Sequence, residues 1–250
     1  YGIKGVDHIA KDGLLSTIIG GSYPSGPSSL PMPEIWRMLT EDRVAAYNVP
    51  SGILFDMHTD AAARRPGVLT QVGLDTFVDP IREGCAMNAS AAARPIVNRV
   101  EFGGETWLHF PNIIPDVAIL RATTADEHGN LTYEHEGAYL GGLEQAICVR
   151  NHGGLVIAQV KRVTAAGSLR PHDVRVPGHL VDLVVFYPDE RETTETVYRS
   201  DTRPDFAPTT VAMSLASSLS WISPDPLKLT CWPRRTDTPA LVQHGLAGML

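Results

Sequence analysis

Polar residues that follow a predicted strand form the first group that could bind a small molecule. The segment VGLDTFVDP, residues 72–80, contains Gly73, Thr76 and Asp79, and Asn88 ends the next segment, EGCAMN. Open α/β sheets bind their ligands beyond the carboxyl ends of strands, so these residues are candidates for substrate binding. The alternative is a tight loop in which Thr76 and Asp79 hydrogen-bond to their own backbone. The sequence leaves both interpretations open.

A second polar segment occupies an equivalent position later in the chain. The run DVAILRA has the pattern of a buried strand and leads into TTADEHGN, residues 123–130. Asp126 and Asn130 are the candidates for substrate binding in this segment. Both residue types are also common turn formers, so the same two interpretations apply.

The familiar catalytic and metal-binding patterns are missing from the sequence. It contains no GxGxxG, Walker phosphate loop, HExxH or GxSxG. Its nine histidines lack the spacing of zinc ligands, so we predict no metal site. Cys85, Cys148 and Cys231 form no CxxC motif and are odd in number, which favours a reducing compartment and a cytoplasmic location.

Composition narrows the class of partner. The 250 residues are 43% apolar, enough to bury a sizeable core, and the net charge is -7. The basic residues are scattered, which argues against a nucleic-acid partner. No stretch approaches the roughly 20 apolar residues of a membrane span, so we expect no membrane partner either. A small-molecule ligand is favoured.

The elements that must position these residues alternate between strands and helices. Apolar runs such as VAAYNV and GVLTQVGL are separated by the helical patterns PEIWRML and GILFDMHTDAAARR. This alternation predicts an α/β fold with an open, mainly parallel sheet and helices on both faces. Gly103 and Gly104 join two alternating runs between residues 97 and 110, which predicts an inserted β-hairpin. A helix over 141–151 and a strand from Leu155 are predicted next.

Five segments together resemble a known family. They are AYNVPSG, VGLDTFVDP, ILRATTADEHGN, AQVKRV and SLRPHDVRVPGHLVD. In this order they are similar to the amino-terminal, or alpha, half of the family I CoA-transferases, which act on acetate, propionate and 3-oxoacids. The resemblance extends from about residue 5 to residue 182, and it implies the CoA-transferase fold, which is like that of sugar-phosphate isomerases.

The resemblance also implies an activity. Enzymes of this family move coenzyme A between a short-chain acyl-CoA, such as acetyl-, propionyl- or 3-oxoacyl-CoA, and a carboxylic acid through a glutamyl-CoA intermediate. Coenzyme A is then a substrate, and no cofactor is expected. The glutamate belongs to the second half, and Glu134, Glu136 and Glu144 lack its sequence context. We therefore expect no catalytic residue in this chain, and a beta-type half or a homo-oligomer as the protein partner.

Some features depart from the family pattern. The opening strand and glycine-rich loop of the family are not found, so we expect the domain to be incomplete at its amino terminus. Asp75 and Cys85 stand where the family usually has glycines. Residues 1–208 are predicted to form the α/β domain, and residues 209–250 an irregular tail without family resemblance. The alternative function is a non-catalytic remnant or acyl-CoA-binding module. A third hypothesis, a sugar-phosphate isomerase, is supported by topology alone.

Overall fold

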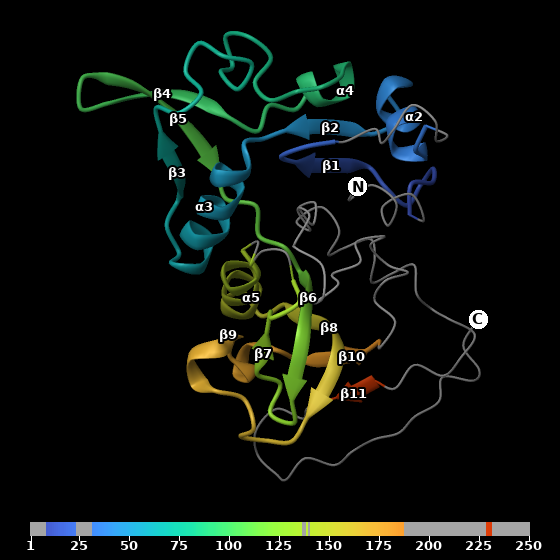
Figure 1. Cartoon of the computed structure of the whole chain (residues 1–250). Coiled ribbons are helices and arrows are strands. Elements are labelled where there is room, and N and C mark those ends of the chain that lie inside the picture. The colour runs from blue at the N-terminus through green and yellow to red at the C-terminus, as the bar shows by residue number, and fades with distance from the viewer. Residues whose placement is uncertain (1–8, 24–31, 137–138, 140, 188–228, 232–250) are drawn as a thin grey trace. The chain divides into compact units, whose positions relative to one another are not determined.

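The computed structural model describes residues 9–23, 32–136, 139, 141–187 and 229–231 (Figure 1). The chain divides into two compact units, essentially residues 3–114 and 115–250, and each has its own buried core. Apart from residues 229–231, the predicted tail lies outside the described residues, as does the end of the predicted domain from residue 188.

The first unit opens with a parallel pair of strands. Strands β1 (Thr17–Gly20) and β2 (Ala45–Asn48) are adjacent and parallel, and helix α2 (Glu34–Thr40) lies between them in the sequence. A parallel pair needs such a crossover because its strands run in the same direction. Helix α3 (Ser51–Ala62) follows β2 and buries Ile53 and Met57 in the core of this unit.

A small antiparallel sheet completes the first unit. Within the described residues its order is β3 (Gly67–Thr70), β5 (Glu105–Pro111) and β4 (Asn98–Phe102). Phe102 pairs with Glu105, and the two glycines between them, Gly103 and Gly104, have φ angles of 66° and 83°. Only glycine adopts this conformation without strain, and the predicted β-hairpin is confirmed. The short helix α4 (Ala89–Ala92) precedes β4.

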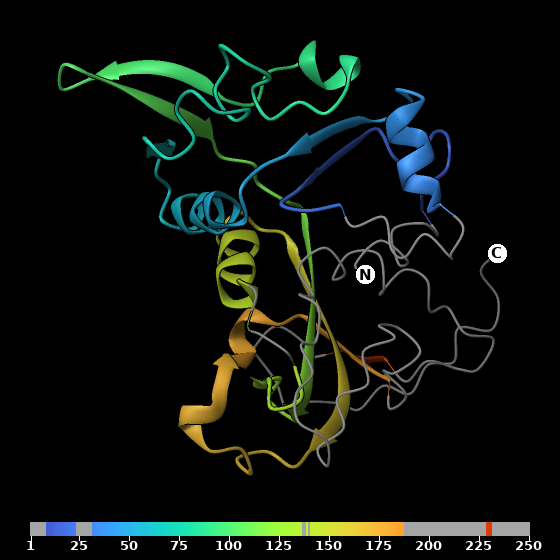
Figure 2. The same cartoon turned by 45° about the horizontal axis from the view of Figure 1, so that its top comes forward.

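The second unit contains a larger mixed sheet. Its order in the described residues is β11 (Leu229–Cys231), β10 (Leu183–Phe186), β8 (Leu155–Thr164), β6 (Val117–Asp126), β7 (Leu131–Thr132) and β9 (Val174–Val176). The central strands β6, β8 and β10 are parallel to one another. The predicted helix is α5 (Gly142–Asn151), which packs on β6 and β8 (Figure 2).

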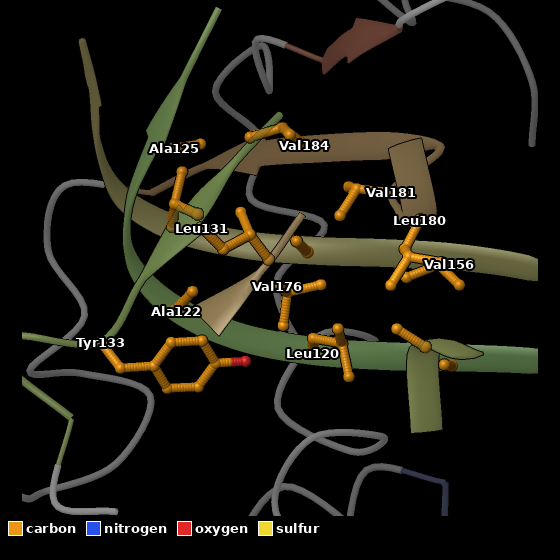
Figure 3. Packing of buried hydrophobic residues seen from close by; sticks show 14 of the residues in the cluster. Leu120, Ala122, Ala125, Leu131, Tyr133, Val156, Val176, Leu180, Val181 and Val184 are labelled. Atoms are coloured by element: carbon orange, nitrogen blue, oxygen red, sulfur yellow. The ribbon is translucent and has the colours of Figure 1, made fainter. Parts of the chain in front are cut away.

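The core of the second unit lies between this sheet and α5. Apolar residues of β6 and β8, among them Leu120, Ala122 and Val156, gather with Val176 and Leu180 from later in the chain (Figure 3). The near-continuous burial of β6 is typical of a central parallel strand.

The α/β fold predicted from the sequence is confirmed. Parallel strands occur in both units; antiparallel strands flank them in the second unit and form a separate sheet in the first. Across the described residues, no helix has the length and apolar character that crossing a membrane requires.

Candidate functional site

The segment between β3 and α4, residues 71–88, contains four of the predicted site residues, and we call it the 71–88 loop. At its centre lies Asp79, which is fully buried, with 0% of its surface exposed. One carboxylate oxygen, Oδ2, accepts a hydrogen bond from the backbone N–H of Asp75 at 2.9 Å, and Oδ1 accepts one from Ile81 at 3.2 Å. The Asp79 side chain therefore replaces the backbone acceptors that a regular element would supply.

Thr76 and Gly73 form the first turn of this loop. The Thr76 hydroxyl donates to the Gly73 carbonyl at 2.7 Å and accepts from the Val78 N–H at 3.3 Å. Gly73 has a φ of 96°, and a Cβ atom at this position would lie 2.9 Å from the Val78 side chain. Only glycine fits there. The turn interpretation of Thr76 and Asp79 accounts for these hydrogen bonds, and contact with a substrate stays a prediction.

A basic residue on the hairpin faces the same carboxylate. Arg99 of β4 places its Nη1 atom 3.6 Å from Oδ2 of Asp79, and its Nη2 atom 3.8 Å from Oδ1 of Asp75. Burial alone would raise the pKa of Asp79, but the two N–H donors and the charge of Arg99 outweigh it and lower this pKa. Asp79 is thus a carboxylate at neutral pH. Arg99 was not among the predicted site residues, because only the return of the hairpin brings it near the loop.

Two non-glycine residues of the 71–88 loop adopt the left-handed conformation. Asp75 has a φ of 61° and Cys85 a φ of 68°. The resemblance seen in the sequence implies glycines at these two positions, and the left-handed backbone there is a conformation that glycine adopts readily. Cys85 is 0% exposed, and burial raises the pKa of its thiol to about 12. It is therefore a thiol, not a thiolate, at neutral pH.

The loop ends beside β2, where Asn88 anchors it. The Cys85 carbonyl accepts from Asn48, and Met87 donates to Ala46. The Asn88 amide donates to the carbonyls of Leu39 at 3.1 Å and Val44 at 2.7 Å. Its side-chain oxygen also caps α4. Asn88 is thus bonded mainly to backbone, which ties the loop to the first unit.

In the second unit, Asp126 and Asn130 bind each other. Oδ1 of Asp126 accepts from the N–H groups of His128 and Asn130, both at 2.9 Å, and the Asn130 amide donates to Oδ2 at 2.9 Å. The Asn130 side-chain oxygen accepts from Gly178 at 2.9 Å. A Cβ atom at Gly178 would lie 1.9 Å from the His128 carbonyl, so this contact requires glycine.

A buried ion pair in the second unit was not predicted from the sequence. Nε of Arg121, on β6, lies 3.1 Å from Oε1 of Glu136, and the two side chains are only 11% and 3% exposed. Burial raises the pKa of Glu136, although Arg121 opposes this shift. The residues are 15 positions apart, and no sequence motif links them.

The neighbouring Glu134 is held by a second set of partners. It accepts from Arg162 at 2.6 Å and from the Thr124 hydroxyl. Burial would raise the pKa of Glu134, but the hydrogen bonds from Thr124, Thr132 and Arg162 lower it to about 2. Both glutamates are therefore committed to partners within the fold.

The predicted site residues thus form two groups. Gly73, Thr76 and Asp79 share one hydrogen-bonded loop with Asn88 at its end, whereas Asp126 and Asn130 lie in the other unit. Among the described residues, no three His, Cys, Asp or Glu side chains gather in a way that could hold a metal ion.

The family model described as coenzyme A transferase matches residues 5–186. Acetate CoA-transferase YdiF of Escherichia coli K12 is 35% identical over 189 residues, which cover 76% of this chain and 34% of the relative. One subunit of a probable succinyl-CoA:3-ketoacid coenzyme A transferase from Mycobacterium tuberculosis H37Rv is 31% identical over 153 residues, 58% of this chain and 59% of the relative.

A solved structure of a CoA-transferase is also similar to this chain. The crystal structure of the E. coli O157:H7 acyl-CoA transferase YdiF, a thioester complex with CoA, aligns with a TM-score of 0.67 at 36% identity. The alignment covers 74% of this chain and 35% of that one. The chain therefore spans about a third of the length of its E. coli relatives.

Proposed function

The chain belongs to the coenzyme A transferase family, and from this premise we propose that it is the alpha-type part of an enzyme that moves coenzyme A between a short-chain acyl-CoA and a carboxylic acid. The observation that carries the proposal is the family match over residues 5–186. The name of the E. coli relative, an acetate CoA-transferase, supports acetate as one of the acids.

The proposed reaction needs a carboxylate nucleophile. A glutamate oxygen attacks the thioester carbonyl and the C–S bond breaks. CoA departs as a thiolate, and an acyl-glutamyl anhydride is formed. The thiolate then attacks the glutamyl carbonyl of the anhydride. The first carboxylic acid is released as its carboxylate, and a glutamyl-CoA thioester is formed. The acceptor carboxylate repeats the two steps in reverse, so no cofactor other than the substrate coenzyme A is proposed.

We propose that this glutamate belongs to a partner polypeptide. Glu134 forms an ion pair with Arg162, and Glu136 forms one with Arg121. Neither carboxylate is available to attack a thioester. The partner would correspond to the two thirds of the E. coli relative that this chain does not span. The mycobacterial relative is named as one subunit of its enzyme, which supports a two-chain arrangement; a homo-oligomer is the other possibility within this proposal.

The 71–88 loop is the proposed lining of the acyl site. Gly73, Thr76 and Asp79 would present backbone groups in a fixed geometry, because the Asp79 carboxylate already orients the loop from within. Asn88 would anchor the end of this loop, and Asp126 and Asn130, in the second unit, are proposed separately as substrate-binding residues. A cytoplasmic location is also part of the proposal, and the free, buried thiols of Cys85 and Cys148 support it.

An exchange assay tests the proposed function. The purified chain is mixed with the complementary two thirds of the E. coli relative, propionyl-CoA and radiolabelled acetate, and labelled acetyl-CoA is measured. We expect label transfer only when both polypeptides are present. Lack of transfer by the mixture would contradict the proposed function. Acyl-CoA binding without any transfer would instead favour the non-catalytic module.

A further inference from the structure

The 71–88 loop exposes several large apolar side chains and buries one charged side chain. Three large apolar residues within ten positions face solvent, with Val72 64%, Phe77 46% and Ile81 57% exposed. Meanwhile Asp79 is 0% exposed, and it is the sole buried polar or charged residue in the described part of the first unit. Charged residues are rarely buried in folded proteins, and a cluster of exposed large apolar residues marks an interaction surface.

The backbone holds these apolar side chains in a fixed display. Besides the two bonds to the Asp79 carboxylate, the Asp79 carbonyl accepts from Arg82 and Gly84, and Cys85 donates to the Phe77 carbonyl. Asp75 is left-handed, which costs a non-glycine residue about 1–2 kcal/mol. Such strain persists only where the surrounding structure fixes the conformation. The loop is therefore a rigid frame.

The pattern around the side chains of Val72, Phe77 and Ile81 fits a protein partner, whereas the proposed acyl site uses backbone groups of Gly73, Thr76 and Asp79. Gln71, Asp75, Arg82 and Glu83 are exposed on either side of them in the sequence. Protein interfaces combine an apolar centre with a polar rim, whereas small-molecule sites are concave and enclose their ligand. Side chains that are about half exposed or more project into solvent instead of lining such an enclosure.

We propose that Val72, Phe77 and Ile81 form the docking surface for the partner polypeptide, the counterpart of the two thirds of the E. coli relative that this chain does not span. This inference rests on the proposed function. Relatives of the E. coli type carry both parts in one chain, so the part equivalent to this chain has a protein neighbour of about twice its matched length. The loop brings three of the exposed large apolar side chains of the first unit together within ten positions, which is why we assign it to such a neighbour.

Binding measurements with a matched control test the proposal. The double variant Phe77→Ser and Ile81→Ser is compared with Phe102→Ser, because Phe102 is 64% exposed in the same unit but lies at the hairpin turn. Isothermal titration with the complementary E. coli polypeptide, without CoA, gives the dissociation constants. We expect the double variant to lose affinity for this polypeptide by roughly tenfold or more. The affinity of Phe102→Ser should change by less than about twofold. The conservative variant Phe77→Leu should bind nearly as well as the natural chain, and unchanged thermal melting would show that all variants fold.

Several outcomes would overturn the docking proposal. One is an equal loss of affinity for the complementary polypeptide in the loop and hairpin variants. Others are no loss of affinity in either variant, or no binding of this polypeptide by the natural chain. Light scattering that showed a dimer of this chain, abolished by the double variant, would assign the surface to a second copy instead. Loss of acyl-CoA binding with unchanged partner binding would assign it to the substrate. Intact docking without label transfer would contradict only the proposed function, so the two failures are distinguishable.

Discussion

The 71–88 loop and the β6–β8 pair reach a fixed shape in different ways. Strands β6 and β8 run in register from Val117 opposite Leu155 to Asp126 opposite Thr164, and repeated backbone hydrogen bonds hold them. The loop has no such ladder, and one carboxylate, Asp79, bonds the backbone at two points instead. The paired strands are held by a regular series of backbone bonds, whereas the loop combines irregular backbone bonds with the bonds of the Asp79 carboxylate. Each region also contains a buried charge, and we expect its removal to have a large effect.

The largest effect is expected at the buried ion pair beside β6. Arg121→Met leaves the Glu136 carboxylate buried without its cation, which should lower the free energy of unfolding by about 3–5 kcal/mol. Urea unfolding followed by circular dichroism measures this change. The double variant Arg121→Met with Glu136→Leu should recover most of the loss, because no buried charge is left over. A single variant as stable as the natural chain would show that the pair is not desolvated.

The next effect is expected in the loop. Asp79→Ala leaves the N–H groups of Asp75 and Ile81 without their acceptor, and we expect a loss of about 2–3 kcal/mol in the free energy of unfolding. Asp79→Asn keeps one oxygen acceptor and should lose less. Equal losses for both variants would mean that charge, and not the two hydrogen bonds, determines the role of Asp79. Urea unfolding of the three proteins decides between these outcomes.

A smaller effect of opposite sign is expected at Asp75. Glycine adopts its φ of 61° without strain, so Asp75→Gly should raise the free energy of unfolding by about 0.5 kcal/mol, after the entropy cost of glycine in the unfolded chain. Asp75→Ala keeps the Cβ atom and should give no gain. Thermal melting of both variants measures the difference. Destabilisation by glycine would argue against a strained residue at this position.

The smallest effect concerns pH and the partly exposed Glu134. Its pKa falls from 4.5 to about 2 on folding, so the stability it contributes is fully present above pH 4.5 and is lost as the pH falls toward 2. Glu134→Gln should therefore flatten the dependence of unfolding free energy on pH between 5 and 3. Urea titrations at three pH values in this range measure the slope. An unchanged slope would show that Glu134 has no depressed pKa in the folded chain.

Local signals in the sequence were sufficient for much of the fold. The hairpin follows from Gly103 and Gly104, and α5 with β8 follows from helical spacing, two glycines and an apolar run. Contacts set by tertiary register could not be predicted this way. Arg121 meets Glu136, and Arg99 meets Asp79, only after strands distant in the sequence have paired. The hydrogen bonds of Asp79 to its own loop are local, and the sequence did offer them as the turn alternative to substrate binding.

The location of the covalent intermediate tests the central claim most directly. This chain and the complementary E. coli polypeptide are incubated together with propionyl-CoA, and intact-mass and peptide mass spectrometry locate the attached coenzyme A. The account predicts a hydroxylamine-sensitive thioester on a glutamate of the complementary polypeptide and none on this chain. Coenzyme A attached to any acidic side chain of this chain would contradict it.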